Sequence, residues 1–150
     1  MKVLIDTCIL SEIHRTGGDS SIKQTLLSYD ENALFLSVIT IGEIAKGIFL
    51  LPSSVKKSNL MNWLNGLETK FSDRILPIDR ETTFIWGEMI ARAKKEGITI
   101  PGIDGLIAAT ALRYGLHVMT CNSRHFQGTG VFIINPLLKN NRKENPNNMI

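Results

Sequence analysis

The stretch that decides the fold is VLIDT, residues 3–7, where three consecutive apolar side chains are followed at once by an acid. A continuous apolar run of this length is typical of a strand buried on both faces of a parallel sheet. An Asp directly after such a strand can cap a helix, because its side chain accepts hydrogen bonds from backbone N–H groups of the first turn. The segment therefore predicts a buried strand over residues 2–5 and a helix that follows it to about His14.

The rest of the chain repeats this alternation between short apolar runs and longer helical patterns. Thr40 is the expected N-cap of a helix that stops before Pro52, and Gly97 and Gly115 are the expected ends of two later helices. Strands that alternate with helices indicate an α/β fold, with a mostly parallel sheet of four or five short strands covered on both faces. The other predicted strands are residues 34–38, 74–78, 117–120 and 131–134, and the other predicted helices are residues 20–29, 41–50, 54–71, 80–96 and 103–114.

Length and composition fit a single globular domain. The chain has 150 residues, of which 43% are hydrophobic and 21% are charged, and no apolar run approaches the roughly 20 residues that cross a membrane. The domain is predicted to span residues 1–138. Residues 139–150 are rich in asparagine and mixed charges, which predicts a disordered polar tail. Most of the net charge of +3 lies in that tail, so the charge permits an anionic partner but does not establish nucleic-acid binding.

The cysteines and the N-terminal segment bear on the cellular compartment. Cys8 and Cys121 form neither a CxxC pair nor a disulfide framework. The first segment turns acidic at Asp6 and has no small-residue cleavage site after it, so no signal peptide is predicted. These features favour a reducing compartment such as the cytoplasm, with no membrane association.

Three acids fall near the points where predicted strands end and predicted helices begin. Asp6 follows the first strand, Glu43 lies just inside the helix after the second, and Asp104 lies in the first turn of the helix that Pro101 and Gly102 open. Functional groups of parallel sheets gather at the carboxyl edge, so the three acids are plausible neighbours in space. Carboxylates beside apolar walls are costly unless they are paired or bound to a cation. An oxygen-only set favours a hard divalent ion, Mg²⁺ or Mn²⁺.

Each acid also has a purely structural explanation, which the residues alone leave open. Asp6 could cap the first helix, and Asp104 could answer the positive end of its helix dipole. Thr40 and Glu43 fit a capping box, in which the Glu43 side chain would hydrogen-bond back to the Thr40 backbone. No Lys or Arg stands close to Asp6 or Asp104 in the sequence, although a distant one could fold in.

Four segments follow one another along the chain in a familiar order: VLIDT (residues 3–7), SVITIGE (37–43), IDGLIAATA (103–111) and TCNSRHF (120–126). Together they resemble the PIN-domain ribonucleases, and most closely the VapC and FitB-like toxins of bacterial toxin–antitoxin pairs. The resemblance implies a PIN-like three-layer α/β/α domain. It implies that Asp6, Glu43 and Asp104 are catalytic acids that hold the metal, and that Asn122 completes the catalytic set where many members have a fourth acid. It further implies that Thr7, Ser37 and Thr120 are small polar residues lining the site.

The function that the resemblance implies is a Mg²⁺-dependent endoribonuclease, the toxin of a toxin–antitoxin pair, neutralised by a VapB-like antitoxin and forming a homodimer. Two departures from the family pattern stand out. Cys8 replaces the Asn or Ser that commonly follows Asp-Thr, which puts the order of the hydrogen bonds around the metal ligands in doubt. Asn122 in place of a fourth carboxylate favours one firmly held Mg²⁺ rather than two.

The alternative function is a non-catalytic nucleic-acid-binding or regulatory module that acts with a DNA-binding partner. Three intact acids argue against it, because carboxylates repel phosphate unless a cation intervenes. Other phosphotransfer enzymes fit less well, because position 8 is not the second acid of an Asp-x-Asp pair and the chain has no Gly-rich phosphate loop.

Two further features carry weaker hypotheses. Arg113, Arg124 and His125 are candidates for contact with RNA phosphate, although solvated surface residues are the commoner outcome. An apolar groove that could receive a helix of the antitoxin is expected on the helices around residues 41–50 and 54–71, where ordinary core is the simpler interpretation. Its candidate residues are Ile48, Phe49, Leu50, Trp63, Leu64 and Leu67.

Overall fold

A sheet of five parallel strands forms the centre of the computed structural model, which describes residues 1–138. The predicted tail at 139–150 lies outside the described residues. The strand order is β3-β2-β1-β4-β5, so the first strand is central and lies between β2 and β4. The strands are β1 (Val3–Ile5), β2 (Leu34–Ser37), β3 (Ile75–Leu76), β4 (His117–Met119) and β5 (Ile133–Ile134).

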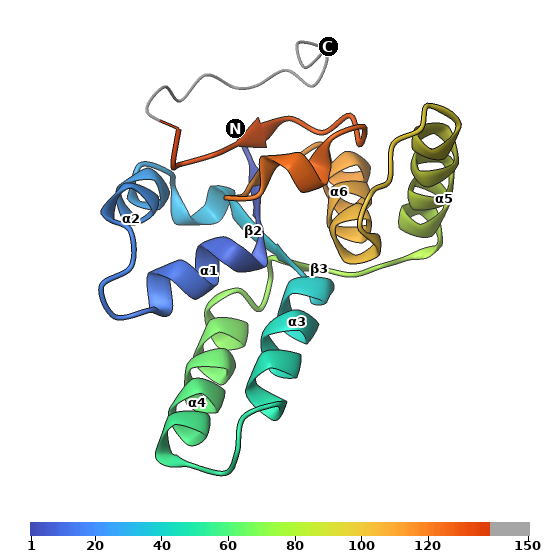
Figure 1. Cartoon of the computed structure of the whole chain (residues 1–150). Helices are drawn as coiled ribbons and strands as arrows, with labels where there is room; N and C mark the ends of the chain where they lie inside the picture. Colours follow the sequence, from blue (N-terminus) through green and yellow to red (C-terminus); the bar gives the residue numbers. More distant parts are fainter. Residues whose placement is uncertain (139–150) are drawn as a thin grey trace.

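Helices cover both faces of this sheet, which confirms the predicted three-layer α/β/α architecture (Figure 1). Most predicted helices exist within one or two residues of the expected bounds. The strands are shorter than predicted, and two short 3-10 helices were not predicted. The helices are α1 (Thr7–His14), α2 (Ser20–Leu27), α3 (Val38–Phe49), α4 (Val55–Lys70), α5 (Arg80–Lys95) and α6 (Gly102–Tyr114), with 3-10 helices at Glu31–Ala33 and Ser123–Phe126.

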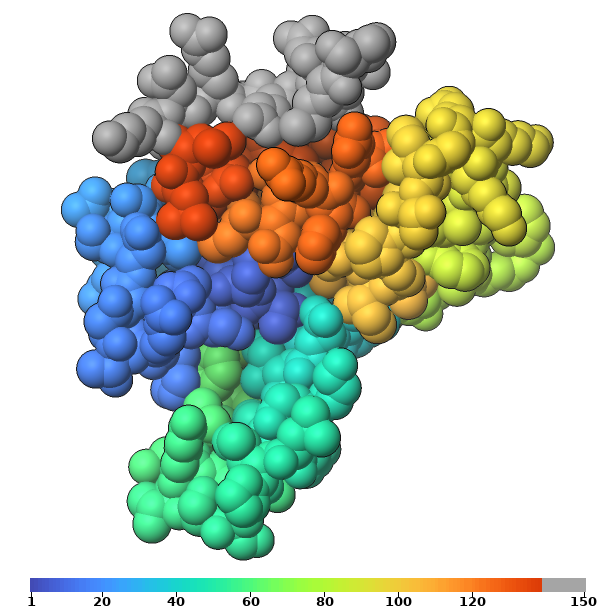
Figure 2. Space-filling model, in the orientation of Figure 1, coloured from blue at the N-terminus to red at the C-terminus, as the bar shows by residue number. Residues whose placement is uncertain are grey.

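The central strand divides the core into two parts, because successive side chains of a strand point to opposite faces. Val3 and Ile5 pack with apolar residues of α1, α2, α3 and α4. Leu4 packs on the other face, with residues of α5 and α6. All three side chains are almost fully buried, as the continuous apolar run predicted. Helices α3 and α4 extend beyond the sheet as a hairpin, which stands out from the body in the space-filling view (Figures 1 and 2).

Helix α3 begins three residues earlier than predicted. Its N-cap is Ser37, whose Oγ accepts a hydrogen bond from the Ile39 backbone N–H at 3.1 Å. Thr40 therefore lies inside the helix and is fully buried, and the predicted Thr40–Glu43 capping box is wrong. The apolar, β-branched residues after Ser37 look like a continuing strand, but the serine cap ends β2 at once. Glu43 consequently lies in the second turn of α3, where its side chain is available for another contact.

Among residues 1–138, no helix combines the length and the hydropathy needed to span a membrane.

Candidate active site

Asp6 is the buried centre of the site, with 3% of its surface exposed. Parallel pairing fixes its backbone, since the Asp6 N–H donates to the Met119 carbonyl at 2.9 Å. Its Oδ1 accepts a hydrogen bond from the Thr7 backbone N–H at 2.8 Å, so Asp6 is the N-cap of α1. Its Oδ2 accepts a hydrogen bond from the hydroxyl of Thr120 at 2.7 Å. The capping interpretation of Asp6 is thus correct, and it leaves the carboxylate oriented by two donors at the carboxyl edge of the sheet.

Cys8 fills the remaining space beside this carboxylate. Its Sγ lies 3.4 Å from Asp6 Oδ2 and 3.5 Å from Thr120 Oγ1, and it accepts a hydrogen bond from the Cys121 backbone N–H at 3.1 Å. A hydrogen bond to the Cys121 thiol, burial and the Asp6 charge all raise the pKa of Cys8, so its thiol stays protonated and neutral. The same thiol–thiol hydrogen bond lowers the pKa of Cys121. Although Cys8 replaces the Asn or Ser that is common at this position, the Asp6 carboxylate still has defined hydrogen-bond partners.

Glu43 is brought to Asp6 by Thr7. The Thr7 hydroxyl donates a short hydrogen bond to Glu43 Oε2, while the Thr7 backbone N–H donates to Asp6. A single residue therefore bridges two acids that are distant in the sequence. The early start of α3 makes this possible, because it turns Glu43 toward the first turn of α1.

Asp104 completes the group from the first turn of α6. Burial raises the pKa of its carboxyl, and the negative charges of Asp6 and Glu43 raise it further, while His125 opposes the shift. His125 Nδ1 lies 3.0 Å from Asp104 Oδ2. The charges of both other acids therefore affect the pKa of Asp104, as expected for neighbours at one edge of the sheet.

The three acids lie close enough to affect the pKa of Asp104, but their carboxylates do not converge on one point as metal ligands would. Thr7 holds Glu43, and His125 holds Asp104. In this arrangement no three His, Cys, Asp or Glu side chains of residues 1–138 converge as metal ligands. The donor set nevertheless suits Mg²⁺ or Mn²⁺, because all three groups are carboxylates. Burial, and after it the charges of Asp6 and Glu43, raise the pKa of Asp104, and a bound cation would offset this cost of the ionised form.

The other predicted residues occupy different places around this group. Asn122 is exposed and joins the site through its backbone, since its N–H donates to Thr120 Oγ1 at 3.0 Å and its carbonyl accepts from the His125 N–H. Ser37 is buried as the cap of α3, so its observed role is to set where that helix begins. Arg124 is exposed beside a shallow pocket of about 360 Å³, which is lined by residues 121–125, Asn135 and Leu138.

Arg113 and His125 differ most from the sequence interpretation. Arg113 joins α6 to the start of α5 through ion pairs to Glu81 at 2.7 Å and to Asp79 at 3.6 Å. It therefore contacts acids of α5 and not the three acids of the candidate site. His125 supplies the partner of Asp104 that the sequence left open. A signal was present, because His125 lies in the same short segment as Asn122, but its contact depends on the turn formed by residues 123–126.

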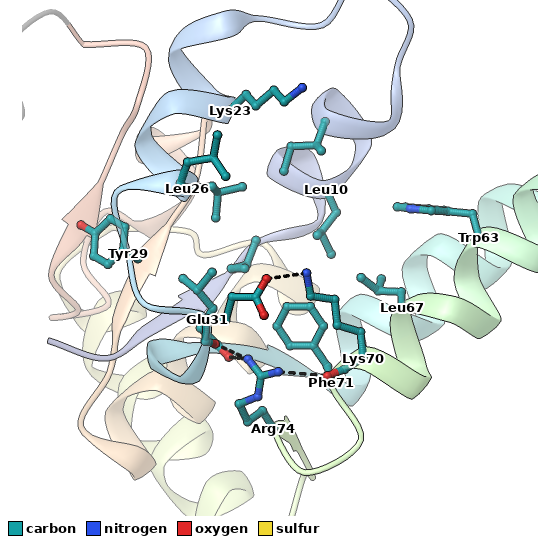
Figure 3. A pocket seen from close by; sticks show the side chains of 14 residues that line it. Leu10, Lys23, Leu26, Tyr29, Glu31, Trp63, Leu67, Lys70, Phe71 and Arg74 are labelled. Carbon is teal, nitrogen blue, oxygen red and sulfur yellow. Dashed lines mark hydrogen bonds and ion pairs between the residues drawn. The ribbon is translucent and has the colours of Figure 1, made fainter.

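A second hollow, of about 430 Å³, opens between α1, α2 and α4 (Figure 3). Apolar side chains dominate its wall, and the Lys70–Glu31 ion pair at 2.8 Å lies beside it. Of the residues predicted to form an apolar groove, only Trp63 and Leu67 line it. Ile48 and Leu64 are core residues, as the simpler interpretation held, and Phe49 and Leu50 are exposed at the end of α3. Other lining residues are Ile5, Leu10, Ile13, Leu26, Leu27 and Phe71.

The protein is thus an α/β/α sandwich domain with an acidic site, formed by three carboxylates at the carboxyl edge of its parallel sheet. Comparison with known proteins identifies the family. The family described as PIN domain matches residues 3–130. This chain belongs to the PIN-domain family.

Named relatives and solved structures agree with this assignment. Toxin FitB of Neisseria gonorrhoeae is 33% identical over 135 residues, covering 89% of this chain and 97% of the relative. VapC ribonuclease Y4jK of Sinorhizobium fredii is 30% identical, covering 89% of this chain and 96% of the relative. The crystal structure of FitAcB from Neisseria gonorrhoeae superposes with a TM-score of 0.87 at 33% identity, covering 91% of this chain and 99% of that one. A structure of FitAB bound to a DNA fragment gives the same TM-score at 31% identity, covering 93% and 99% of the two chains.

Proposed function

We propose that this protein is a metal-dependent endoribonuclease and the toxin of a toxin–antitoxin pair. The observation that carries the proposal is the grouping of Asp6, Glu43 and Asp104, three acids from separate parts of the chain. Thr7 joins Asp6 to Glu43, and the charges of these two acids raise the pKa of Asp104. The names of the relatives, a toxin and a ribonuclease, supply the reaction and the biological setting.

Asp6, Glu43 and Asp104 would hold a single Mg²⁺, for which Mn²⁺ is a plausible substitute. When bound, such an ion acidifies a water for attack on a phosphodiester and neutralises charge that develops on the phosphate. Thr7 and Thr120 orient Asp6 through hydrogen bonds, which fixes the oxygens that would face the ion. Arg124 and His125, both exposed, would contact substrate phosphates beside the acids, and Asn122 would complete the polar wall.

The test of this site compares RNA cleavage by the wild type and by Asp6→Ala, each with Mg²⁺ and with EDTA. With Mg²⁺ we expect cleavage by the wild type and by a control with an intact site, and none by Asp6→Ala; with EDTA we expect no cleavage by any of them. Glu88→Gln is the matched control, because Glu88 is an exposed acid on α5. Mg²⁺ should raise the melting temperature of the wild type and of Glu88→Gln but not of Asp6→Ala, since only a folded site binds the ion. Undiminished cleavage by pure Asp6→Ala protein would contradict the proposal.

The proposed partner is a cognate VapB-like antitoxin. A structure of similar fold is described as a toxin–antitoxin complex from Klebsiella pneumoniae, and the FitAB structure is bound to a DNA fragment. The hollow between α1, α2 and α4 has the apolar wall that an amphipathic antitoxin helix would cover. A regulatory role in such a complex and a nuclease activity are therefore compatible.

Cytoplasmic location and homodimer formation remain predictions. Light scattering of the purified chain would test whether it forms the dimer.

A further inference from the structure

The pairing of β1 with β4 brings the only two cysteines of the chain together beside the acids. Ile5 and Met119 are register partners, and each cysteine lies two or three residues beyond its partner position. The first turn of α1 then folds Cys8 back over the end of β4. As a result the Cys121 backbone N–H donates to Cys8 Sγ at 3.1 Å, although 113 residues separate the two positions.

We propose that Cys8 and Cys121 form a reversible disulfide under peroxide stress, and that this bond inhibits the active site. Because a backbone N–Cα bond is about 1.5 Å long, the Cys121 Cα lies within about 4.6 Å of the Cys8 sulfur. A cysteine sulfur lies roughly 2.8 Å from its own Cα, so the two Cα atoms are at most about 7.4 Å apart, against the roughly 4.4–6.8 Å that a disulfide needs. A shift of about 1 Å or less in the first turn of α1 therefore suffices for the bond. Both cysteines are free thiols and are partly exposed. Cys121 also lines the open pocket formed with residues 122–125, which gives a small oxidant access.

The oxidation balances with hydrogen peroxide as the oxidant. The Cys121 sulfur attacks one peroxide oxygen, the O–O bond breaks, and a sulfenic acid and one water form. The Cys8 sulfur then attacks the sulfenic sulfur, which forms the S–S bond and releases the hydroxyl as a second water. The two sulfurs are oxidised, the peroxide is reduced, and the two thiol protons leave in the two waters. A dithiol reductant reverses the bond by thiol–disulfide exchange.

The effect on the site follows from what Cys8 touches. Its thiol donates to Asp6 Oδ2 and lies beside Thr120 Oγ1, so a disulfide removes the S–H donor from the carboxylate. The bond also ties the first turn of α1 to the residue before Asn122. Loss of a hydrogen-bonding partner of a metal ligand typically costs about 10- to 100-fold in metal affinity or activity. This inhibitory part rests on the proposed nuclease function, whereas formation of the disulfide does not.

The experiment treats the full-length chain with hydrogen peroxide and measures cross-linking and RNA cleavage separately. We expect a monomer whose mass is lower by two hydrogens, a peptide that joins Cys8 to Cys121, and full recovery of both thiols in dithiothreitol. Cys121→Ser is the control, because it keeps a small polar side chain but cannot form the bond. Each protein's cleavage rate after oxidation is compared with its own rate before oxidation. The wild type should lose about 10- to 100-fold and recover on reduction, and Cys121→Ser should show no loss that reduction reverses.

The outcomes separate the two proposals. A disulfide-linked dimer, over-oxidised cysteines without a cross-link, or thiols that stay free would overturn the inference, even if the reduced protein cleaves RNA. A Cys8–Cys121 cross-link in a protein that cleaves no RNA in either state would support the disulfide and contradict the nuclease. A cross-link that leaves RNA cleavage unchanged would refute the inhibitory role.

Discussion

The hydroxyl of Thr120 should be worth more to stability than any neutral hydrogen bond in the core. Thr120 is fully buried, and its Oγ1 donates to the Asp6 carboxylate at 2.7 Å while accepting from the Asn122 N–H at 3.0 Å. Thr120→Val keeps the shape of the side chain and removes both bonds. A hydrogen bond to a charged group contributes about 1.5–3 kcal/mol, and a neutral one about 0.5–1.5 kcal/mol. The expected loss in free energy of unfolding is therefore about 2–4.5 kcal/mol.

Urea titration without divalent metal measures this loss directly, because the midpoint falls while the slope stays unchanged if the fold is intact. For a domain of this size, each kcal/mol corresponds to a shift of about 2–4 °C in melting temperature. Thr110→Val is the matched control. Thr110 is equally buried, but its hydroxyl donates only to the Leu106 carbonyl one helical turn away. That substitution should cost less than about 1 kcal/mol, since the Leu106 carbonyl also belongs to the helix ladder.

The two threonines separate a carboxylate held by a charged hydrogen bond from an ordinary buried hydroxyl. Thr120→Val should also slow RNA cleavage by about 10- to 100-fold, because Asp6 loses a group that orients it. If Thr120→Val is as stable and as active as Thr110→Val, then Thr120 does not hold Asp6 in solution and the geometry of the site is misread.

Two further predictions test the charge of the site and the partner surface. Because burial, Asp6 and Glu43 raise the folded-state pKa of Asp104 above its unfolded value, the ionised carboxyl disfavours folding, so stability is lost as pH rises through that pKa. In EDTA, Asp104→Asn should gain stability relative to the wild type as pH rises above about 4, the ordinary value for an Asp carboxyl. Urea titration measures the difference in free energy of unfolding, and a difference that stays constant with pH would contradict the coupling. Leu27→Glu, which adds a charge beside the apolar hollow, should weaken antitoxin binding about tenfold or more, as a desolvated charge costs over 1.4 kcal/mol. Val55→Glu, which is equally exposed at 77% but outside the hollow, should bind normally by calorimetry, and equal effects of the two would exclude the hollow as the contact.

The sequence by itself determined the α/β alternation and the place of two acids. Apolar runs and helix signals are local properties, so the strand before Asp6 and the helix that carries Asp104 followed from their own neighbours. The four family-like segments extended this to the PIN fold, which the structure and its relatives confirm. Local signals misplaced the start of α3, because the apolar residues after Ser37 suit a strand or a helix equally well.

Tertiary structure alone decided how the acids are connected. Thr7 meets Glu43 across 36 residues, and His125 meets Asp104 only because a 3-10 turn follows β4. Cys8 and Cys121 are adjacent because parallel register aligns β1 with β4. Each of these contacts joins residues that are far apart in the sequence. It depends on how several strands and helices pack together, so it could not be predicted from any one segment. Residue types told us which chemistry was possible, and the register of the sheet determined which of those residues could act together.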